Sequence, residues 1–345
     1  MSRPSNALKE RRQMNSNTVL LLITIALFIV LYAAGCIAYA DRGFTNLQTF
    51  LNLFRTNAGL ICVACGMTCV MLTGGIDISV GSLVALDCML MAYGMSEWGI
   101  SAPVMILLVL VIGLVFGLVQ GLCVGYLEIQ PFIVTMAGMF FARGMTAVIS
   151  TNQLSTTAEI NQLFYDMANY RIYLPAALGY ANKKGIIQVP YIGIGVVVAL
   201  VVLVIVFLVL RYTVFGRDLF VIGSGIEVAR LSGIKVRKTF YLVYSLAGFV
   251  YGIAAIMFAG RILRAMPNTG DGYDMDAIAA AVIGGASLAG GRGAITGTFV
   301  GTLLMVVIKN AGKAFQINYY ILDVITGALI IFAVAMDMVK SRKKA

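Results

Sequence analysis

The chain has 345 residues, of which 60% are hydrophobic and 12% are charged, with a mean hydropathy of +0.94. Soluble globular proteins contain about 45 to 50% apolar and about 25% charged residues, so too little polar surface is left here for a water-soluble fold. The chain also contains no histidine, which excludes Ser-His-Asp triads, Cys-His pairs and histidine metal sites. We therefore expect a membrane protein without these chemistries.

Runs of about 20 mostly apolar residues, the length that crosses the hydrocarbon core of a bilayer, recur along the whole sequence. They predict an all-α polytopic membrane protein with about ten transmembrane helices. The expected spans are 18–40, 57–73, 79–96, 103–127, 131–150, 190–211, 240–260, 274–290, 294–312 and 319–338. The run at 274–290 is the weakest of them, and an even number of spans places both termini on one side.

Basic residues gather in three segments outside these spans, at 1–17, 212–239 and 339–345. Lysine and arginine are concentrated on the cytoplasmic side of membrane proteins, and counting crossings places all three segments on one side. We therefore expect two cytoplasmic tails, a cytoplasmic loop at 212–239 and a periplasmic loop at 151–189, all within one transmembrane domain, 1–345. The formal charge of +10 then flanks the bilayer, so nucleic acid is not an expected partner.

Two predicted spans, 103–127 and 294–312, carry glycine at every fourth position. These glycines are Gly113, Gly117, Gly121 and Gly125 in the first, and Gly297 and Gly301 in the second with Gly293 directly before it. Small residues allow close approach of helices in lipid, so we expect both stripes to be packing faces. The two spans also run in opposite directions, which raises the hypothesis of an inverted repeat of helices 2–5 and 7–10.

All six cysteines lie in apolar runs. Cys62, Cys65 and Cys69 share a helix face, but without histidine we interpret them as small buried side chains rather than metal ligands. We expect no catalytic residue, no metal and no bound cofactor in this chain. The Gly-x-x-x-x-Gly-Lys-Ser/Thr motif of P-loop ATPases is also missing, so energy for pumping has to come from a partner or a gradient.

Four ionisable residues fall at membrane depth: Asp77, Asp87, Arg143 and Asp323. Charged groups are costly in the bilayer and are therefore candidates for function. Asp87 and Arg143 could form a structural ion pair within the bundle or could line a pathway, and both alternatives stay open.

Two glycine-rich breaks interrupt the apolar runs, one at 73–82 and one at 284–293. Broken helices expose backbone groups that only protein or a water-lined cavity can satisfy, and transporters build sites and gates at such breaks. The residues that we assign to a translocation path or gate are Gly74, Gly75, Asp77, Ser79, Ser82, Gly284 and Gly285. The alternative is a tight turn between two helices.

The predicted cytoplasmic segment 215–234 is short, helical in its middle and closed by Gly233. A brief helix that protrudes on the basic side is suited to dock in a groove of a cytoplasmic partner. The alternative is an ordinary basic loop.

At these residues the sequence resembles the permease subunits of bacterial ABC importers for monosaccharides, of the ribose, xylose and galactoside type. The similar segments are 73–82, 131–133, 215–234, 276–280 with the glycine pairs that follow it, and 327–337. They occur in the family's order over nearly the whole chain. Taken together, they are far more specific than any one of them.

The resemblance implies an inner-membrane subunit that works as a dimer with a second permease chain, identical or not. This dimer takes a monosaccharide from a periplasmic sugar-binding protein. Cytoplasmic ATP-binding subunits, which hold ATP and Mg, would drive it and grip the segment around 225–234. The residues implied in ATPase coupling are Gly225, Glu227, Ala229, Arg230, Ser232 and Gly233. The family usually has Asn where Gly225 stands and Ala where Val228 stands, so this chain departs from the family's pattern at two positions of the segment.

Two other classes of function remain as alternatives. The first is a gradient-driven secondary transporter of a small polar solute, against which the few intramembrane carboxylates count. The second is a membrane scaffold without transport.

Overall fold

The structure, a computed structural model, describes residues 16–38, 44–181, 187–314 and 318–342. Residues 1–15 of the predicted N-terminal tail, 343–345 of the predicted C-terminal tail and the last two residues of the first predicted span lie outside this part. The helices are α1 (Ser16–Ala38), α2 (Leu47–Leu72), α3 (Val80–Ser96), α4 (Ala102–Gly125), α5 (Pro131–Ile149), α6 (Gln162–Ala168), α7 (Ile194–Tyr212), α8 (Val214–Ser224), α9 (Ile226–Leu231), α10 (Val236–Ile262), α11 (Tyr273–Ile283), α12 (Ile295–Ala314) and α13 (Tyr319–Arg342).

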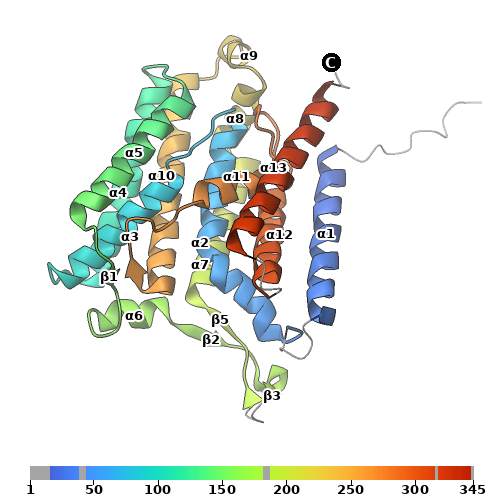
Figure 1. Ribbon diagram of the computed structural model, residues 1–345. Coiled ribbons are helices and arrows are strands. Elements are labelled where there is room, and N and C mark those ends of the chain that lie inside the picture. Colours follow the sequence, from blue (N-terminus) through green and yellow to red (C-terminus); the bar gives the residue numbers. More distant parts are fainter. Residues whose placement is uncertain (1–15, 39–43, 182–186, 315–317, 343–345) are drawn as a thin grey trace, which may run out of the picture.

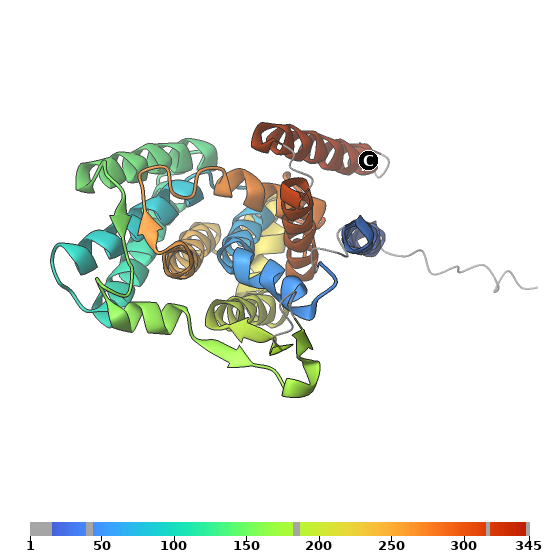
Figure 2. The ribbon, with the colours of Figure 1, turned by 60° about the horizontal axis from the view of Figure 1, so that its bottom comes forward.

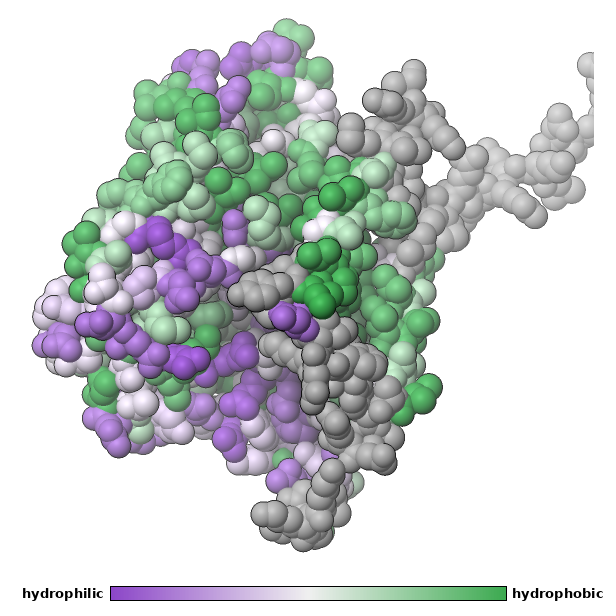
Figure 3. All heavy atoms as spheres, viewed as in Figure 1, coloured by the Kyte–Doolittle hydropathy of each residue, from purple (hydrophilic) through white to green (hydrophobic). Residues whose placement is uncertain are grey.

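Long apolar helices confirm a polytopic membrane protein. In the described residues α2, α4, α5, α7 and α10 are long and apolar enough to cross a bilayer, and α1, α3 and α12 contain shorter apolar stretches. On the face in Figure 3, hydrophilic residues gather at the end that carries α9 and in the lower part of the molecule, with many hydrophobic residues between them.

The helix boundaries differ from the predicted spans at two places. The predicted span 274–290 is wrong over 284–290, because α11 ends at Ile283 and its 11 residues cover only about 16 Å. The predicted span 57–73 begins too late, since α2 starts at Leu47 and bends at Asn57, whose φ and ψ are −124° and 18°. The part of α2 before this bend contains polar residues, including Gln48, Asn52 and Arg55. A search for continuous apolar runs therefore did not detect the start of the helix.

The centre of the bundle consists of α2 and α10. Their apolar stretches are 78% and 67% buried, whereas those of α4, α5 and α7 are 28% buried or less. The central helices contact each other, and each contacts two helices of the other half: α10 contacts α3 and α4, and α2 contacts α11 and α12. Helices α4, α5 and α7 therefore lie on the outside of the bundle (Figure 2).

The glycine stripe of α4 is confirmed as a packing face. A Cβ atom at Gly113 would lie 2.5 Å from the carbonyl oxygen of Gly248, and one at Gly117 would lie 2.2 Å from that of Tyr244. These distances are too short for any side chain, so glycine allows α4 to approach the backbone of α10 directly. The second stripe serves another pair of helices, because Gly297 packs on α11 at the carbonyl oxygen of Gly284, 1.9 Å from the built Cβ.

The predicted periplasmic loop contains short elements of its own at the end of the molecule opposite α9 (Figure 1). The strands are β1 (Leu154–Ser155), β2 (Arg171–Tyr173), β3 (Tyr180–Ala181), β4 (Ile187–Gln188), β5 (Tyr191–Gly193) and β6 (Arg264–Ala265). They form antiparallel pairs β1–β6, β2–β5 and β3–β4. Asn161 begins α6 by accepting a hydrogen bond from the Phe164 backbone N–H, which satisfies one of the free donors of the first turn.

Candidate functional site: two helix breaks and the segment that contacts them

The first predicted break is a loop between α2 and α3. The chain leaves α2 through Gly74, whose φ of +81° is the left-handed conformation that glycine adopts without strain. The Gly74 N–H donates to the Met71 carbonyl at 2.9 Å, and the Gly75 N–H donates to the Val70 carbonyl at 3.3 Å. These bonds close the last turn of α2, and the chain is then non-helical until Val80.

A turn at Asp77 fixes the rest of this loop. One carboxylate oxygen, Oδ1, accepts hydrogen bonds from the Ser79 backbone N–H at 2.9 Å and from its hydroxyl at 2.6 Å. The Gln120 amide of α4 donates to the Ser79 hydroxyl at 2.9 Å, and the Thr135 hydroxyl of α5 donates to the Ile76 carbonyl at 3.1 Å. Two other helices therefore hold the break in place.

The same turn lies beside buried polar atoms of α10. Asp77 Oδ2 and the hydroxyls of Tyr244 and Tyr251 are buried and have no hydrogen-bond partner by strict geometry among the described residues. Both tyrosines lie within electrostatic range of Asp77, and the Tyr244 hydroxyl lies 2.8 Å from the position of a Cβ at Gly75. Ser82, one turn into α3, is buried as well. The break thus has donors and acceptors available for a water molecule or a hydroxyl-bearing solute.

The second predicted break, 284–293, contacts the first, but through residues other than the predicted pair. Gly284 packs against α12, and Gly285 turns the chain with a φ of +96°. It is Gly290 that packs against the backbone of Gly74, and the Gly291 N–H donates to the Leu72 carbonyl at 3.0 Å. The assignment of Gly284 and Gly285 to the same site as Gly74 is therefore not supported by contact, and Gly290 and Gly291 were missed.

Helix α8 meets both breaks at one point. A Cβ at Gly223 would lie 1.9 Å from the Leu72 carbonyl oxygen and 2.2 Å from the Gly291 nitrogen, and one at Gly291 would lie 2.6 Å from the Ser224 hydroxyl. Three segments distant in sequence therefore touch backbone to backbone, and none of them can accept a side chain there. A displacement of α8 has to displace both breaks, because packed interiors transmit strain.

The brief helix predicted within 215–234 is confirmed as α9, which follows α8 directly and projects beyond the bundle (Figure 1). Gly225 begins α9 and accepts from the Ala229 N–H at 3.0 Å. At the other end the Ser232 hydroxyl donates to the Val228 carbonyl at 2.8 Å, and Gly233 turns away with a φ of +79°. Three of the six predicted coupling residues therefore shape the ends of this helix.

The remaining residues of α9 divide between the bundle and solvent. Ala229 is fully buried, and α9 contacts α10. Val228 and Leu231 are 59% and 89% exposed, and Glu227 and Arg230 are exposed beside them, 3.0 Å apart. Exposed apolar side chains bordered by charges are typical of a contact surface for another protein.

Glu128, in the turn between α4 and α5, connects α9 to the bundle. Its carboxylate accepts from Arg237 at 2.9 Å and lies 3.6 Å from Arg230. The hydrogen bond and charge of Arg237, together with the charge of Arg230, lower the pKa of Glu128 below its ordinary value of 4.5. The left-handed φ of +55° at Glu128 is uncommon for residues other than glycine. Sequence patterns gave no signal for this residue, which lies in a short turn between two apolar runs.

The ionisable residues at membrane depth pair differently from the expectation. The hypothetical pair between Asp87 and Arg143 is wrong: Arg143 forms an ion pair with Asp271 at 2.5 Å and donates to the Pro267 carbonyl. Both carboxylate oxygens of Asp87 are buried without a hydrogen-bond partner among the described residues. The side chain of Asp323 lies outside the described part of the structure.

A second ion pair was missed. Lys309 of α12 binds both carboxylate oxygens of Asp276 in α11, at 2.5 and 2.6 Å. Lys309 lies inside a predicted span and could have been noticed as a charge that needs a partner.

Clusters of three or more Cys, Asp or Glu side chains able to hold a metal ion are not found among the described residues. Cys62, Cys65 and Cys69 are buried in the wall of α2 as free cysteines.

The fold and the site together define a class: a helical membrane protein with broken helices in its interior and a short exposed helix beyond the bundle. Residues 49–334 match the family described as the branched-chain amino acid transport system / permease component. The chain therefore belongs to this family of transport permeases, as the predicted resemblance implies.

Curated relatives share most of their length with this chain. The ribose import permease protein RbsC of Bacillus subtilis is 35% identical over 92% of each chain. The galactose/methyl galactoside import permease protein MglC of Haemophilus influenzae is 32% identical over 92% of this chain and 94% of its own. The inner membrane ABC transporter permease protein YjfF of Escherichia coli is 33% identical over 84% and 82%. No solved structure matches the chain at a significant level.

Proposed function

We propose that this chain is the membrane subunit of an ATP-driven importer for a monosaccharide. The names of the relatives support a sugar as the cargo, since ribose and galactoside permeases match over nearly the whole chain. The substrate would be delivered by a periplasmic sugar-binding protein, and a second permease chain would complete the path. The chain itself performs no covalent chemistry.

The observation that carries this proposal is the direct contact between the α8–α9 segment and both helix breaks. Helix α9 offers exposed Val228 and Leu231 to a cytoplasmic ATP-binding subunit, and α8 touches the breaks through Gly223. Closure of the ATP-binding subunits, which hold ATP and Mg, would push on α9 and change the breaks. Two packed arrangements of the breaks would then give inward-open and outward-open states.

The buried polar atoms around Asp77 are the proposed lining of the path. Asp77, Tyr244 and Tyr251 offer hydrogen-bond donors and acceptors, which suits a polyhydroxyl solute. Affinity would reside in the soluble binding protein, so this lining has only to be weakly favourable.

The packing of the two halves supports the hypothesis of an inverted repeat. Helices α2 and α10 occupy corresponding central positions, and the contacts of α2 with α11 and α12 mirror those of α10 with α3 and α4. The breaks do not correspond in this scheme, because the first lies between α2 and α3 and the second between α11 and α12. The count of ten spans requires that α3, with 17 residues, and α11, with 11, each count as a crossing although α11 is too short to span alone.

The orientation that we propose puts α9 in the cytoplasm and the strands β1 to β6 in the periplasm of a bacterial inner membrane. It rests on the basic residues around α9, among them Arg217, Arg230, Lys235, Arg237 and Lys238. Both termini would then be cytoplasmic. A gradient-driven transporter remains the alternative, but nothing in the comparisons favours it.

The decisive experiment is purification of the tagged chain from its native membranes in mild detergent, with mass spectrometry of the proteins that accompany it. We expect a P-loop ATPase, and we expect it to be lost from the double variant Val228→Asp/Leu231→Asp. Matched substitutions on the opposite side, Leu163→Asp and Tyr170→Asp, change two other exposed residues and should leave the ATPase bound. Recovery of equal ATPase with the α9 variant would refute docking at α9, and uptake driven by an imposed gradient without ATP would support the alternative.

A further inference from the structure

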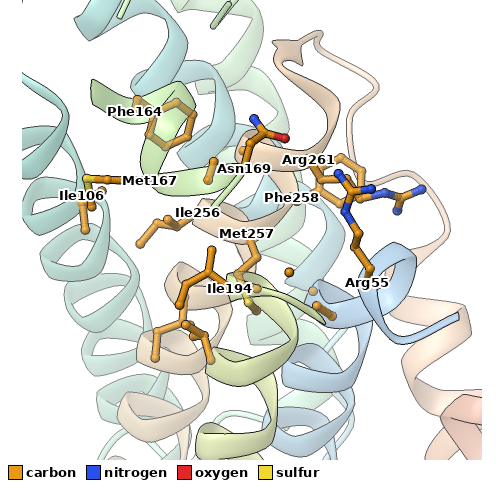
Figure 4. Close-up of a pocket in the computed structure, with 18 of the residues that line it drawn as sticks. Arg55, Ile106, Phe164, Met167, Asn169, Ile194, Ile256, Met257, Phe258 and Arg261 are labelled. Atoms are coloured by element: carbon orange, nitrogen blue, oxygen red, sulfur yellow. The ribbon is translucent and has the colours of Figure 1, made fainter. Parts of the chain in front are cut away.

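A cavity on the outer side of the bundle has no part in the proposed coupling. It has a volume of about 330 Å³ and lies between α2, α4, α6, α7 and α10. Figure 4 shows aliphatic and sulfur-containing side chains, including Ile106, Ile194, Ile256 and Met257, on one side and two arginines, Arg55 and Arg261, together at the other. The cavity is thus apolar along its wall and cationic at one end.

The two arginines have unused binding capacity. Arg55 donates to the Tyr191 hydroxyl at 2.8 Å, and Arg261 donates to the Thr56 carbonyl. Each guanidinium has five N–H donors, and neither arginine forms an ion pair with a carboxylate among the described residues. The two cations also lie within electrostatic range of each other. Repelling cations beside an apolar wall are stabilised by an anion that binds both of them.

The apolar wall has the dimensions of one bilayer leaflet. On α10 the lining runs from Ile253 to Arg261, about 12 Å along the helix axis. Half of the hydrocarbon core of a bilayer measures about 15 Å. The arginines therefore lie at the level of lipid headgroups when Ile253 lies near the bilayer centre.

Helix α6 closes the cavity at its outer end. The Ala168 Cβ lies 2.5 Å from the position of a Cβ at Gly260, so only glycine there lets α6 rest on α10. Phe164, on the same helix, is 1% exposed. Helix α6 contacts α4, α7 and α10, which leaves the lining between α4 and α7 on the lipid-facing outer layer.

We propose that this cavity binds an anionic phospholipid, with its phosphate on Arg55 and Arg261 and one acyl chain along α10. A monosaccharide does not fit the lining, because polar groups occur at the arginine end and the aliphatic wall offers a sugar no hydrogen bonds. The lipid would hold α6 and the first turn of α7 against α10. This inference requires only that the chain lies in a membrane and does not depend on the ATP-driven mechanism.

The test is native mass spectrometry of the full-length chain in mild detergent with phosphatidylglycerol, phosphatidylcholine of the same acyl chains, or inorganic phosphate added. We expect phosphatidylglycerol to bind ~10-fold more tightly than phosphatidylcholine, from charge-assisted hydrogen bonds to the arginines. In the double variant Arg55→Gln/Arg261→Gln this preference should disappear. Arg264→Gln, an exposed arginine at the same end of the molecule that does not line the cavity, is the matched control and should keep it.

A second variant tests the acyl chain separately. A Cβ at Gly195 would make only ordinary contacts of 3.9 Å with Ala58 and Met257, so Gly195→Phe fills the cavity and leaves both arginines in place. We expect it to weaken binding of both lipids. Unchanged preference in the arginine variant would overturn the headgroup site, and unchanged binding in Gly195→Phe would overturn the acyl site. Inorganic phosphate that binds as tightly as phosphatidylglycerol would show a site for a soluble anion instead of a lipid.

Discussion

At the scale of single residues, the site depends on polar side chains that are buried with few partners. Asp77 holds Ser79 through one carboxylate oxygen, and its other oxygen is buried near the Tyr251 hydroxyl without a well-aligned hydrogen bond. Glu128 lies at the surface instead, and its carboxylate forms ion pairs with both Arg237 and Arg230. The first arrangement offers an acceptor to a solute, and the second links the docking helix to the turn between α4 and α5.

Substitutions of Asp77 separate these two roles of its carboxylate. Asp77→Asn keeps an acceptor for Ser79, so we expect normal amounts of protein in the membrane and reduced uptake. Asp77→Ala leaves the buried Ser79 donors without this acceptor, which costs about 1 to 3 kcal/mol, so its yield should fall as well. Yield is measured by detergent extraction and uptake with radiolabelled sugar in the complete transporter. Equal yields of both variants would contradict a structural role of the Asp77 turn.

Glu128→Gln should impair coupling without loss of protein, since an exposed ion pair contributes little to stability. We expect a several-fold lower stimulation of the ATPase by substrate-loaded binding protein, with Glu97→Gln, an exposed glutamate next to α3, unchanged.

The pH dependence of this effect follows from the lowered pKa of Glu128. A lowered pKa means that the ionised, paired form is present above the ordinary value of 4.5 and is lost only as pH falls below it. The difference between wild type and Glu128→Gln should therefore be constant from about pH 6 to about pH 8. A difference that disappears within this range would rule out the carboxylate as its cause.

At the scale of elements, the important contact is the one between the end of α8 and the two breaks. It consists of backbone atoms and of glycines at 223, 290 and 291. Apart from the Ser224 hydroxyl, such a contact has few side chains that can adjust, so we expect movement of α8 to be passed on directly. The glycine stripe of α4 also forms a backbone contact without intervening side chains, and it holds α4 against α10.

Gly223→Ala tests the junction. Its Cβ would lie 1.9 Å from the Leu72 carbonyl oxygen, and overpacking of this kind costs about 1 to 3 kcal/mol or more, so we expect low yield or an uncoupled ATPase. Gly144→Ala in α5 is the control, because its Cβ would meet no other atom within 4 Å and the residue lies away from α8 and α9. Thermal unfolding in detergent and ATPase assays measure both variants. Normal coupling in Gly223→Ala would show that α8 and the breaks move independently.

At the scale of the whole molecule, the polar ends and apolar middle fix how the chain lies in the bilayer. Helix α9 and the cavity at Arg55 and Arg261 lie toward opposite ends, so in the orientation that we propose α9 faces the cytoplasm and the cavity lies in the outer leaflet. Orientation is thus the property on which the functional scheme depends most.

Cysteine accessibility tests this orientation. Ser232→Cys should react with a membrane-impermeant maleimide only after spheroplasts are permeabilised, whereas Glu159→Cys, exposed at the other end, should react in intact spheroplasts. Four native cysteines are buried and the other two are half-buried, so the unmodified chain gives the background. The reverse labelling pattern would place α9 in the periplasm and exclude an ATPase at that surface.

The sequence by itself determined that the protein lies in a lipid bilayer, where most of its membrane helices are and that α9 is present. These properties depend on local composition and periodicity, since a helix in lipid has to be apolar over its length. Similarly, Gly233 ends a helix through its own backbone conformation. The family resemblance could also be seen at this level, because its motifs are continuous in the chain.

Only the tertiary structure decided which distant residues meet. The partner of Arg143 is Asp271 rather than Asp87, and Gly290 rather than Gly284 reaches the first break. Both outcomes depend on where α11 ends and how the helices are rotated, which a hydrophobic pattern leaves undetermined. The cavity at Arg55 and Arg261 exists for the same reason: residues 206 positions apart, with ordinary local sequence around each, come together only when α2 and α10 pack.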